Sequence, residues 1–177
     1  MPLKRMDISS VVVGGGPVAS LVILRTHDSR DGEGLELPIR IGSVEATAIS
    51  MGVRERPGGR PMTHDLLAST ISILGGTLSS VRIMAVQGTT FFAQLELVRA
   101  DGERVYVDAR PSDALALAVR EDVPVYAEDS VLETAALPDF RGVERREEEH
   151  ELEEFHAFVE GLSPEDFNVT HDEKDEE

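Results

Sequence analysis

Acidic residues are distributed unevenly along the 177-residue chain, and this imbalance limits where a folded domain can lie. Residues 139–177 hold 16 Asp and Glu against 4 Lys and Arg, whereas residues 1–138 hold 18 against 13. Most of the formal net charge of −17 therefore falls on the last 39 residues. Because a segment so rich in like charge buries little apolar surface, it does not build a core of its own. The sequence predicts a folded domain over residues 1–138 and a separate acidic helix and tail over residues 139–177.

The apolar pattern of residues 1–138 predicts a mixed α/β domain of the α+β type, with three or four helices packed on a largely antiparallel sheet. Short β-rich runs between Gly, Pro or Asp turns predict strands at Ile8–Gly14, Val18–Thr26, Leu35–Ile41, Val81–Val86, Thr90–Arg99, Arg104–Asp108 and Pro124–Ala127. Helical patterns with start and stop signals predict helices at Gly42–Met51, Thr63–Leu74, Asp113–Arg120 and Ser130–Ala136. Pro38 limits the third strand to an edge or a bulge, because proline cannot donate to the ladder.

The acidic segment has a pattern of its own. Glu144–Gly161 is typical of a charged helix with a thin apolar stripe that includes Phe155 and Phe158, and Thr170–Glu177 is typical of a disordered end. We expect this segment to lie on the surface. A protein partner and a neighbouring subunit of a homo-oligomer are its two candidate contacts.

Composition excludes several classes of protein. The chain has no Cys, which excludes disulfide bonds, thiol nucleophiles and thiolate metal sites. No apolar run approaches the roughly 18 residues of a membrane span, and the charged start lacks a signal-peptide pattern, so we expect a cytoplasmic protein that does not enter membranes. Nearly all basic residues are Arg. Low Lys with abundant Asp and Glu favours a halophilic archaeal source, although the acidic tail by itself would give the same total charge.

Two of the predicted helices begin with the same pattern, an Arg-Pro pair followed by a hydroxyl residue and a carboxylate. Capping of the free backbone N–H groups and the helix dipole explain the hydroxyl and the carboxylate. They do not explain the Arg, because the positive end of the helix dipole repels a guanidinium unless an anion is bound there. A phosphate would pair with the Arg and accept hydrogen bonds from the free N–H groups. We therefore predict that the two starts face a common anion-binding pocket. The residues are Arg60, Thr63 and Asp65 at one start and Arg110, Ser112 and Asp113 at the other.

His64 lies in the first turn of the earlier helix, beside Asp65, and is a candidate general acid or base. The alternative is a first-turn histidine that is solvated or bonded locally. Carboxylates could also hold a hard cation such as Mg²⁺ or Mn²⁺, although their spacing does not show that they converge. The candidate metal ligands are Glu45, Asp65, Asp108 and Asp113.

The only basic cluster of the predicted domain lies in a Gly- and Pro-rich loop before this helix and contains Arg54, Arg56 and Arg60. Three Arg on a loop could follow a phosphodiester backbone. The alternative is an ordinary exposed loop whose charges balance nearby acids.

These motifs resemble those of the bifunctional nuclease family, over roughly Met6–Ala136. The resemblance is carried by Leu37-Pro38-Ile39-Arg40-Ile41-Gly42 with Glu45-Ala46, by Arg60-Pro61-x-Thr63-His64-Asp65-Leu66-Leu67, by Phe91-Phe92-Ala93, and by Asp108-Ala109-Arg110-Pro111-Ser112-Asp113-Ala114 followed by Pro124-Val125-Tyr126. The resemblance implies a mixed α/β domain and cleavage of both DNA and RNA. The Arg loop at residues 54–60 lies where the family varies.

Two functions are consistent with this sequence. In the first, Arg60 and Arg110 hold a scissile phosphate of DNA or RNA, and His64 or a carboxylate-bound metal activates water, with Asp65, Asp108 and Asp113 as the catalytic carboxylates. In the second, the same helix starts bind a nucleotide or another anion without catalysis. The net charge of −5 on residues 1–138 mildly favours the second, because it repels nucleic acid unless the Arg cluster dominates locally.

Overall fold

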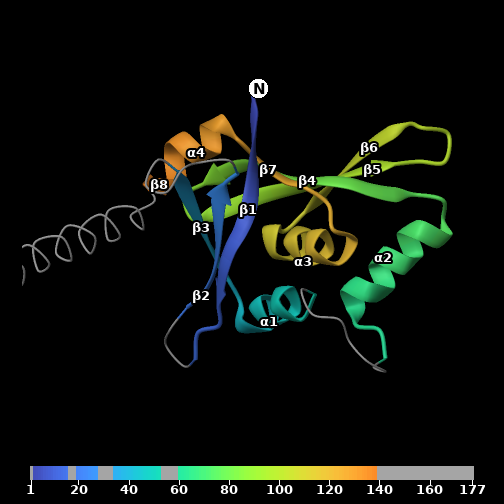
Figure 1. Ribbon diagram of the computed structural model, residues 1–177, viewed down its shortest axis with the longest axis horizontal. Helices are drawn as coiled ribbons and strands as arrows, with labels where there is room; N and C mark the ends of the chain where they lie inside the picture. The colour runs from blue at the N-terminus through green and yellow to red at the C-terminus, as the bar shows by residue number, and fades with distance from the viewer. Residues whose placement is uncertain (1, 16–18, 28–33, 53–59, 139–177) are drawn as a thin grey trace, which may run out of the picture. The chain divides into compact units, whose positions relative to one another are not determined.

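Two groups of three strands are separated by a pair of helices in the computed structural model, which describes residues 2–15, 19–27, 34–52 and 60–138 (Figure 1). The elements of this described part are β1 (Leu3–Val12), β2 (Ser20–Thr26), β3 (Leu35–Ile41), α1 (Ser43–Gly52), α2 (Thr63–Ile73), β4 (Thr77–Gln87), β5 (Thr90–Val98), β6 (Arg104–Ala109), α3 (Pro111–Glu121), β7 (Val125–Glu128), α4 (Asp129–Ala135) and β8 (Leu137–Pro138). The predicted α+β class is confirmed. The acidic segment at residues 139–177 lies outside the described residues, so its predicted helix and contacts stay predictions.

The strands form one sheet in the order β6-β5-β4-β7-β1-β2-β3-β8. Two antiparallel meanders, β1-β2-β3 and β4-β5-β6, are joined by β7, which runs parallel to β4 and antiparallel to β1. The predicted turns between the strands of the second meander are confirmed, with Gly88 and Gly102 both at positive φ. Strand β3 pairs with β8 at Leu35 and Glu36. Strand β8 does not reach Pro38, so β3 has an open edge at this proline, which is where a strand tolerates one.

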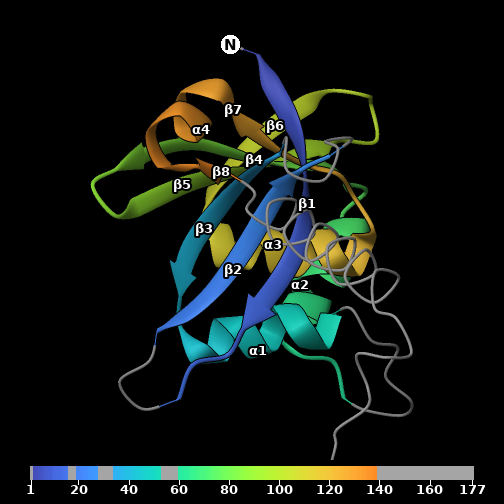
Figure 2. The same cartoon turned by 60° about the vertical axis from the view of Figure 1, so that its left-hand side comes forward.

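The core lies between one face of this sheet and the helices. Helices α1 and α3 pack against each other on that face, and α2 lies beside α3 (Figure 1). Helix α1 lies across one end of β1, β2 and β3 (Figure 2). The five consecutive residues Ala114–Ala118 of α3 are all buried, which confirms the prediction of a helix that is apolar around most of its circumference. Small alanines let α3 approach the strands closely.

Both predicted hydroxyl N-caps are wrong. Helix α2 takes Met62 as its N-cap and α3 takes Arg110, so Thr63 and Ser112 lie inside the first turns. At α2 the carboxylate of Asp65 accepts a hydrogen bond from the Met62 backbone N–H at 2.7 Å. At α3, Pro111 occupies the first helical position, where its fixed φ suits the helix and no N–H is needed. The Asp65 carboxylate at α2 and Pro111 at α3 therefore stabilise the two helix starts, where we predicted that hydroxyl groups would cap them.

Candidate functional site

Arg110 lies at the start of α3 and is paired with two carboxylates of the protein. Its Nε donates to Asp113 Oδ2 at 2.7 Å and its Nη2 to Asp113 Oδ1 at 3.1 Å. Its Nη1 donates to Glu45 Oε1 at 3.4 Å. Hydrogen bonds from Arg110 lower the pKa of Asp113 more than burial raises it, and Asp113 in turn raises the pKa of Arg110. The anion that the sequence required beside Arg110 is thus provided by Asp113 and Glu45, although two-thirds of the Arg110 side chain stays exposed.

His64 joins this group from the first turn of α2. Its Nε2 lies 3.2 Å from Asp113 Oδ1, so one carboxylate contacts both His64 and Arg110. The His64 side chain is 15% exposed. A carboxylate on one ring nitrogen fixes the orientation of an imidazole and leaves the other nitrogen for proton transfer. The two helix starts therefore meet, through His64 and Asp113.

Glu45 reaches Arg110 from the first turn of α1, and Gly42 makes this possible. A Cβ atom at Gly42 would lie 2.1 Å from Glu45 Oε2. A larger residue at this position would therefore displace the carboxylate. We call His64, Asp113, Arg110 and Glu45 the charged cluster.

Asp65 and Arg60 lie on another side of α3. Asp65 Oδ1 accepts a hydrogen bond from Arg120 Nε at 2.7 Å, and Arg120 also donates to the carbonyl oxygens of Ala48 at 3.0 Å and Ala116 at 2.6 Å. Arg120 is 7% exposed, so this contact fastens α2 to α1 and α3 inside the protein. Arg60 lines an open cavity of about 780 Å³ together with Asp65 and Arg120.

Arg60 and Arg110 consequently line different cavities, and the predicted common pocket with both residues at its rim is not found among the described residues. His64 and Asp113 line a groove of about 460 Å³ whose walls are mostly apolar, between α2 and the β5–β6 hairpin. Arg110, Glu45 and Ser112 line a third pocket of about 370 Å³. The separation follows from the contact of Asp65 with Arg120, which holds the segment before α2 near the last turn of α3.

Asp108 borders the groove of His64 and Asp113, but strand alternation directs its side chain elsewhere. Its neighbours Val107 and Ala109 on β6 line the groove and pair with Leu95 and Ala93, which are buried in the core. Asp108 therefore points to the opposite face of the sheet.

The predicted metal ligands do not converge in the described part of the chain, where no three acidic or His side chains gather in a way that could hold an ion. Glu45 and Asp113 share Arg110, and Asp65 is held by Arg120. A guanidinium occupies the place that a cation would take at each of these carboxylates. The described residues therefore do not fit Mg²⁺ or Mn²⁺. Arg54 and Arg56 lie outside the described residues.

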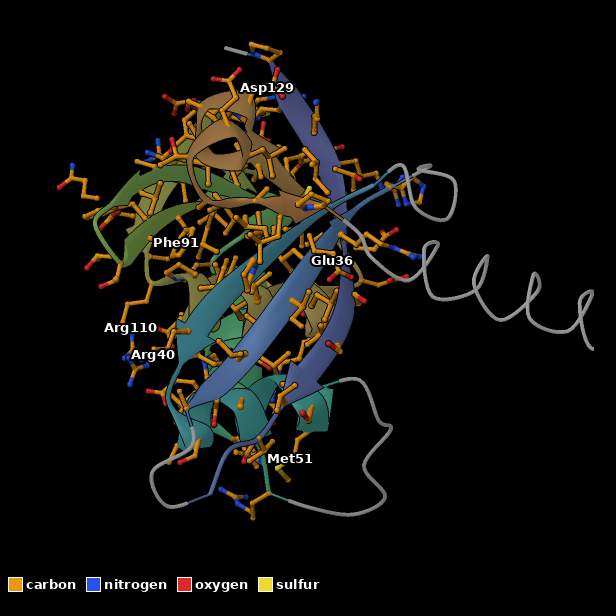
Figure 3. The ribbon with its side chains drawn as sticks, turned by 90° about the vertical axis from the view of Figure 1, so that its left-hand side faces the viewer. Glu36, Arg40, Met51, Phe91, Arg110 and Asp129 are labelled. Atoms are coloured by element: carbon orange, nitrogen blue, oxygen red, sulfur yellow. The ribbon has the colours of Figure 1, made fainter. Side chains whose placement is uncertain are left out.

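Two residues of the third pocket were not singled out as site residues from sequence. Arg40 on β3 and Phe91 on β5 line it with Arg110, and Figure 3 shows Arg40 and Arg110 together at one edge of the molecule, below Phe91. Both residues belong to motifs that carry the family resemblance. Arg40 follows the buried Ile39, so strand alternation could have identified its side chain as exposed. Phe91 lies on the same face of β5 as the buried Ala93, so alternation predicts it as a core residue and gives no signal of a site.

The amino-acid sequence matches one protein family and several relatives. A model of the bifunctional nuclease domain matches residues 22–139. An uncharacterised protein of Mycobacterium tuberculosis is 42% identical over 138 residues, which is 76% of this chain and 82% of the relative. Bifunctional nuclease 1 of Arabidopsis thaliana is 30% identical over 97 residues, 54% of this chain and 30% of that protein, and bifunctional nuclease 2 of the same plant is 28% identical over 108 residues. These relatives come from a mycobacterium and a plant, so they give the halophilic archaeal interpretation no support.

Proposed function

The chain belongs to the bifunctional nuclease domain family, and from this membership we propose that it hydrolyses phosphodiester bonds in DNA and RNA at the charged cluster. The main support for cleavage at this cluster is the position of Asp113. Asp113 contacts both an imidazole and an exposed guanidinium, the two groups that hydrolysis of a phosphodiester needs close together. The plant relatives are named as bifunctional nucleases, which agrees with this chemistry.

Each residue of the cluster has a role in this proposal. A guanidinium has five N–H donors, and three hydrogen bonds of Arg110 go to carboxylates, so two donors remain for a phosphate oxygen. His64 takes a proton from water, the water oxygen attacks phosphorus, and the bond from phosphorus to one sugar oxygen breaks. That sugar oxygen leaves as a hydroxyl, with the proton that His64 took from water. Arg110 stabilises the charge that develops on the phosphate. Asp113 positions both groups, and Glu45 holds Arg110 from the other side.

The remaining predicted residues have more distant roles. Arg60 lines the cavity with Asp65 and Arg120, and in this proposal it would bind a more distant phosphate of the substrate. Thr63 lies beside His64 in the first turn of α2. Ser112 is 7% exposed, which favours a packing role over substrate contact. Among the described residues no helix is long and apolar enough to cross a membrane. The cytoplasmic location and the contact of the acidic tail with a protein partner stay predictions.

The proposal is tested by cleavage of single- and double-stranded DNA and RNA oligonucleotides. We expect His64→Gln to reduce the cleavage rate by about 100-fold or more, because a positioned acid or base typically contributes about that much. The matched control is His27→Gln, since His27 also pairs with a carboxylate, Asp7, at 2.6 Å but lies at the end of β2. Full activity of His64→Gln, or equal losses in the two variants, would contradict the proposal.

The second candidate function is anion or nucleotide binding without catalysis. It is favoured by the third pocket, which Arg40 and Arg110 line and which has no His among its described lining residues to act as an acid or base. It predicts that the wild-type protein binds a short oligonucleotide and leaves it intact in the presence and absence of added Mg²⁺ or Mn²⁺.

A homo-oligomer is also proposed. None of the residues of α2 is buried, and Leu66, Ile73 and Leu74 at and after this helix are 60%, 84% and 81% exposed. Apolar surface of this kind is typical of an interface. Light scattering on the full chain would give the oligomeric state, and a monomer at micromolar concentration would contradict this proposal.

A further inference from the structure

The pocket that contains Arg40 and Arg110 has the composition of a nucleotide-binding site. It lies between the end of β3, the β4–β5 turn and the start of α3, and its volume is about 370 Å³. Its polar residues are Arg40 on β3, Glu45 on α1, Thr89 and Thr90 at the β4–β5 turn, and Arg110 with Ser112 at the start of α3. We call it the Arg40 pocket. Figure 3 shows the labelled Arg40 and Arg110 near each other at one edge of the molecule, with Phe91 above them.

Arg40 is the cation that the Arg40 pocket offers to an anion, although the chain as a whole is strongly acidic. Arg40, Arg110 and Glu45 are the charged residues that line the pocket, and Asp113, which does not line it, pairs with Arg110, so these four charges balance. Arg110 shares its charge with protein carboxylates. No carboxylate of the described residues pairs with Arg40, so its guanidinium is the one that a phosphate would neutralise.

Phe91 gives the pocket an aromatic surface. Its ring is half-buried and packs against the hydrophobic core, which fixes it in place. A fixed and partly exposed ring can stack on a nucleobase with little loss of side-chain entropy. The next residue, Phe92, points to the other face of the sheet and is 38% exposed.

We propose that the Arg40 pocket binds one nucleotide of a single-stranded DNA or RNA, with the phosphate on Arg40 and Arg110 and the base against Phe91. This inference rests on the proposed function, because Arg110 belongs to both sites and would place the bound nucleotide next to the bond that is cleaved. A single strand fits better than a duplex for two reasons. The bases of a duplex are stacked on each other and cannot reach Phe91. A surface with two described Arg cannot follow the many phosphates of a double helix.

The test measures binding separately from cleavage. The probe is a fluorescein-labelled thymidine octamer, followed by anisotropy, and every protein carries His64→Gln so that the probe stays intact. We expect Phe91→Leu and Arg40→Gln each to weaken binding by about tenfold. Arg40→Gln should also reduce the slope of log affinity against log salt by about 0.7, which is the effect of one phosphate contact on a single strand. Phe91→Trp should keep the affinity, since it keeps a stacking surface.

Two controls separate these effects from changes in folding or charge. Phe92→Leu makes the same substitution on the opposite face of β5, and Arg5→Gln removes one exposed Arg from β1, which does not line the pocket. Both should bind the probe as the parent does, and melting curves should show that all variants fold. Unchanged binding by Phe91→Leu and Arg40→Gln would overturn the inference, as would tighter binding of a duplex of the same length.

The outcomes distinguish this inference from the proposed function. If the wild-type protein cleaves oligonucleotides while Phe91→Leu and Arg40→Gln bind normally, the Arg40 pocket is not the nucleotide site and the nuclease proposal stands. If binding depends on Phe91 and Arg40 but the wild-type protein cleaves nothing, the Arg40 pocket is confirmed and the nuclease proposal is wrong.

Discussion

Glu96 is a buried carboxylate in the sheet, on the face opposite α3. It is 2% exposed and accepts hydrogen bonds from Ser80 Oγ at 2.6 Å, from Arg82 Nη2 at 2.5 Å and from Arg104 Nη1. The guanidinium of Arg82 also lies 4.9 Å from the centre of the Tyr106 ring, within the range of a cation–π contact. Burial by itself would raise the pKa of Glu96, but these hydrogen bonds outweigh it and lower the pKa to about 2.

This pKa predicts a pH-dependent contribution to stability. A carboxyl whose pKa is lower in the folded protein stabilises it above its ordinary pKa of 4.5, and the stabilisation is lost as the pH falls from 4.5 to about 2. The shift corresponds to about 3 kcal/mol. We expect Glu96→Gln to lower the free energy of unfolding by about this amount at pH 7, and by much less near pH 2, as measured with urea.

The matched control for Glu96 is Glu103→Gln. Glu103 is 59% exposed and pairs with Arg99 on the surface, where an ion pair contributes about 0–1 kcal/mol. Equal effects of the two substitutions at pH 7 would show that the Glu96 contacts do not stabilise the fold.

Arg110 is expected to be structural as well as functional, because its charge is shared by Asp113 and Glu45. Arg110→Gln should leave both carboxylates without a cation and lower the melting temperature at pH 7. Arg99→Gln should have little effect, since it breaks one exposed ion pair. If the two variants melt at the same temperature, Arg110 has no structural role, and any loss of cleavage in Arg110→Gln then comes from substrate contact.

At the scale of elements, the packing of α1 against α3 depends on a glycine. A Cβ atom at Gly52 would lie 2.5 Å from Val119 Cγ2 and 2.7 Å from Arg120 Nη1. Both atoms belong to side chains of α3, so Val119 and the buried Arg120 would have to shift, and Arg120 would strain its contacts with Asp65, Ala48 and Ala116. We expect Gly52→Ala to destabilise the protein by about 1–3 kcal/mol in urea denaturation. Gly15→Ala is the control, because a Cβ atom there meets nothing within 4 Å. Equal stability of the two variants would contradict this account of the helix packing.

Elements with a clear apolar period and flanking turn residues could be predicted from the sequence. The bounds of β3 agree with the prediction, and most other predicted elements begin or end within a few residues of the observed ones. Strand β8 was missed because two residues carry no period, and their pairing with Leu35 and Glu36 depends on the fold.

The contact of His64 with Asp113 agrees with the expectation that the two helix starts meet. The separation of Arg60 from Arg110 could not be predicted, since it depends on Arg120, seven residues along α3 from Asp113.

At the scale of the whole molecule, the acidic segment is predicted to be dispensable for folding. The described core extends from Met6 to Ala136 and draws on α1, α3, α4 and the sheet. We expect a chain ending at Pro138 to unfold cooperatively in urea, with a transition as sharp as that of the full chain. A broad transition, or aggregation of the shortened chain, would show that residues 139–177 supply part of the core of this chain or of a neighbouring subunit.

The place of β7 in the sheet has a consequence for the order in which the protein can fold during synthesis. Val125 pairs with Met6 on one side and with Val81 on the other, so the two meanders stay unjoined until β7 has left the ribosome. Until then the edges of β1 and β4 are open to pairing with other chains. Residues 139–177 follow β7 in the chain, so β7 can pair with both meanders while these residues are being translated. We therefore expect the acidic segment to matter more for the yield of folded protein from translation than for refolding of the purified chain.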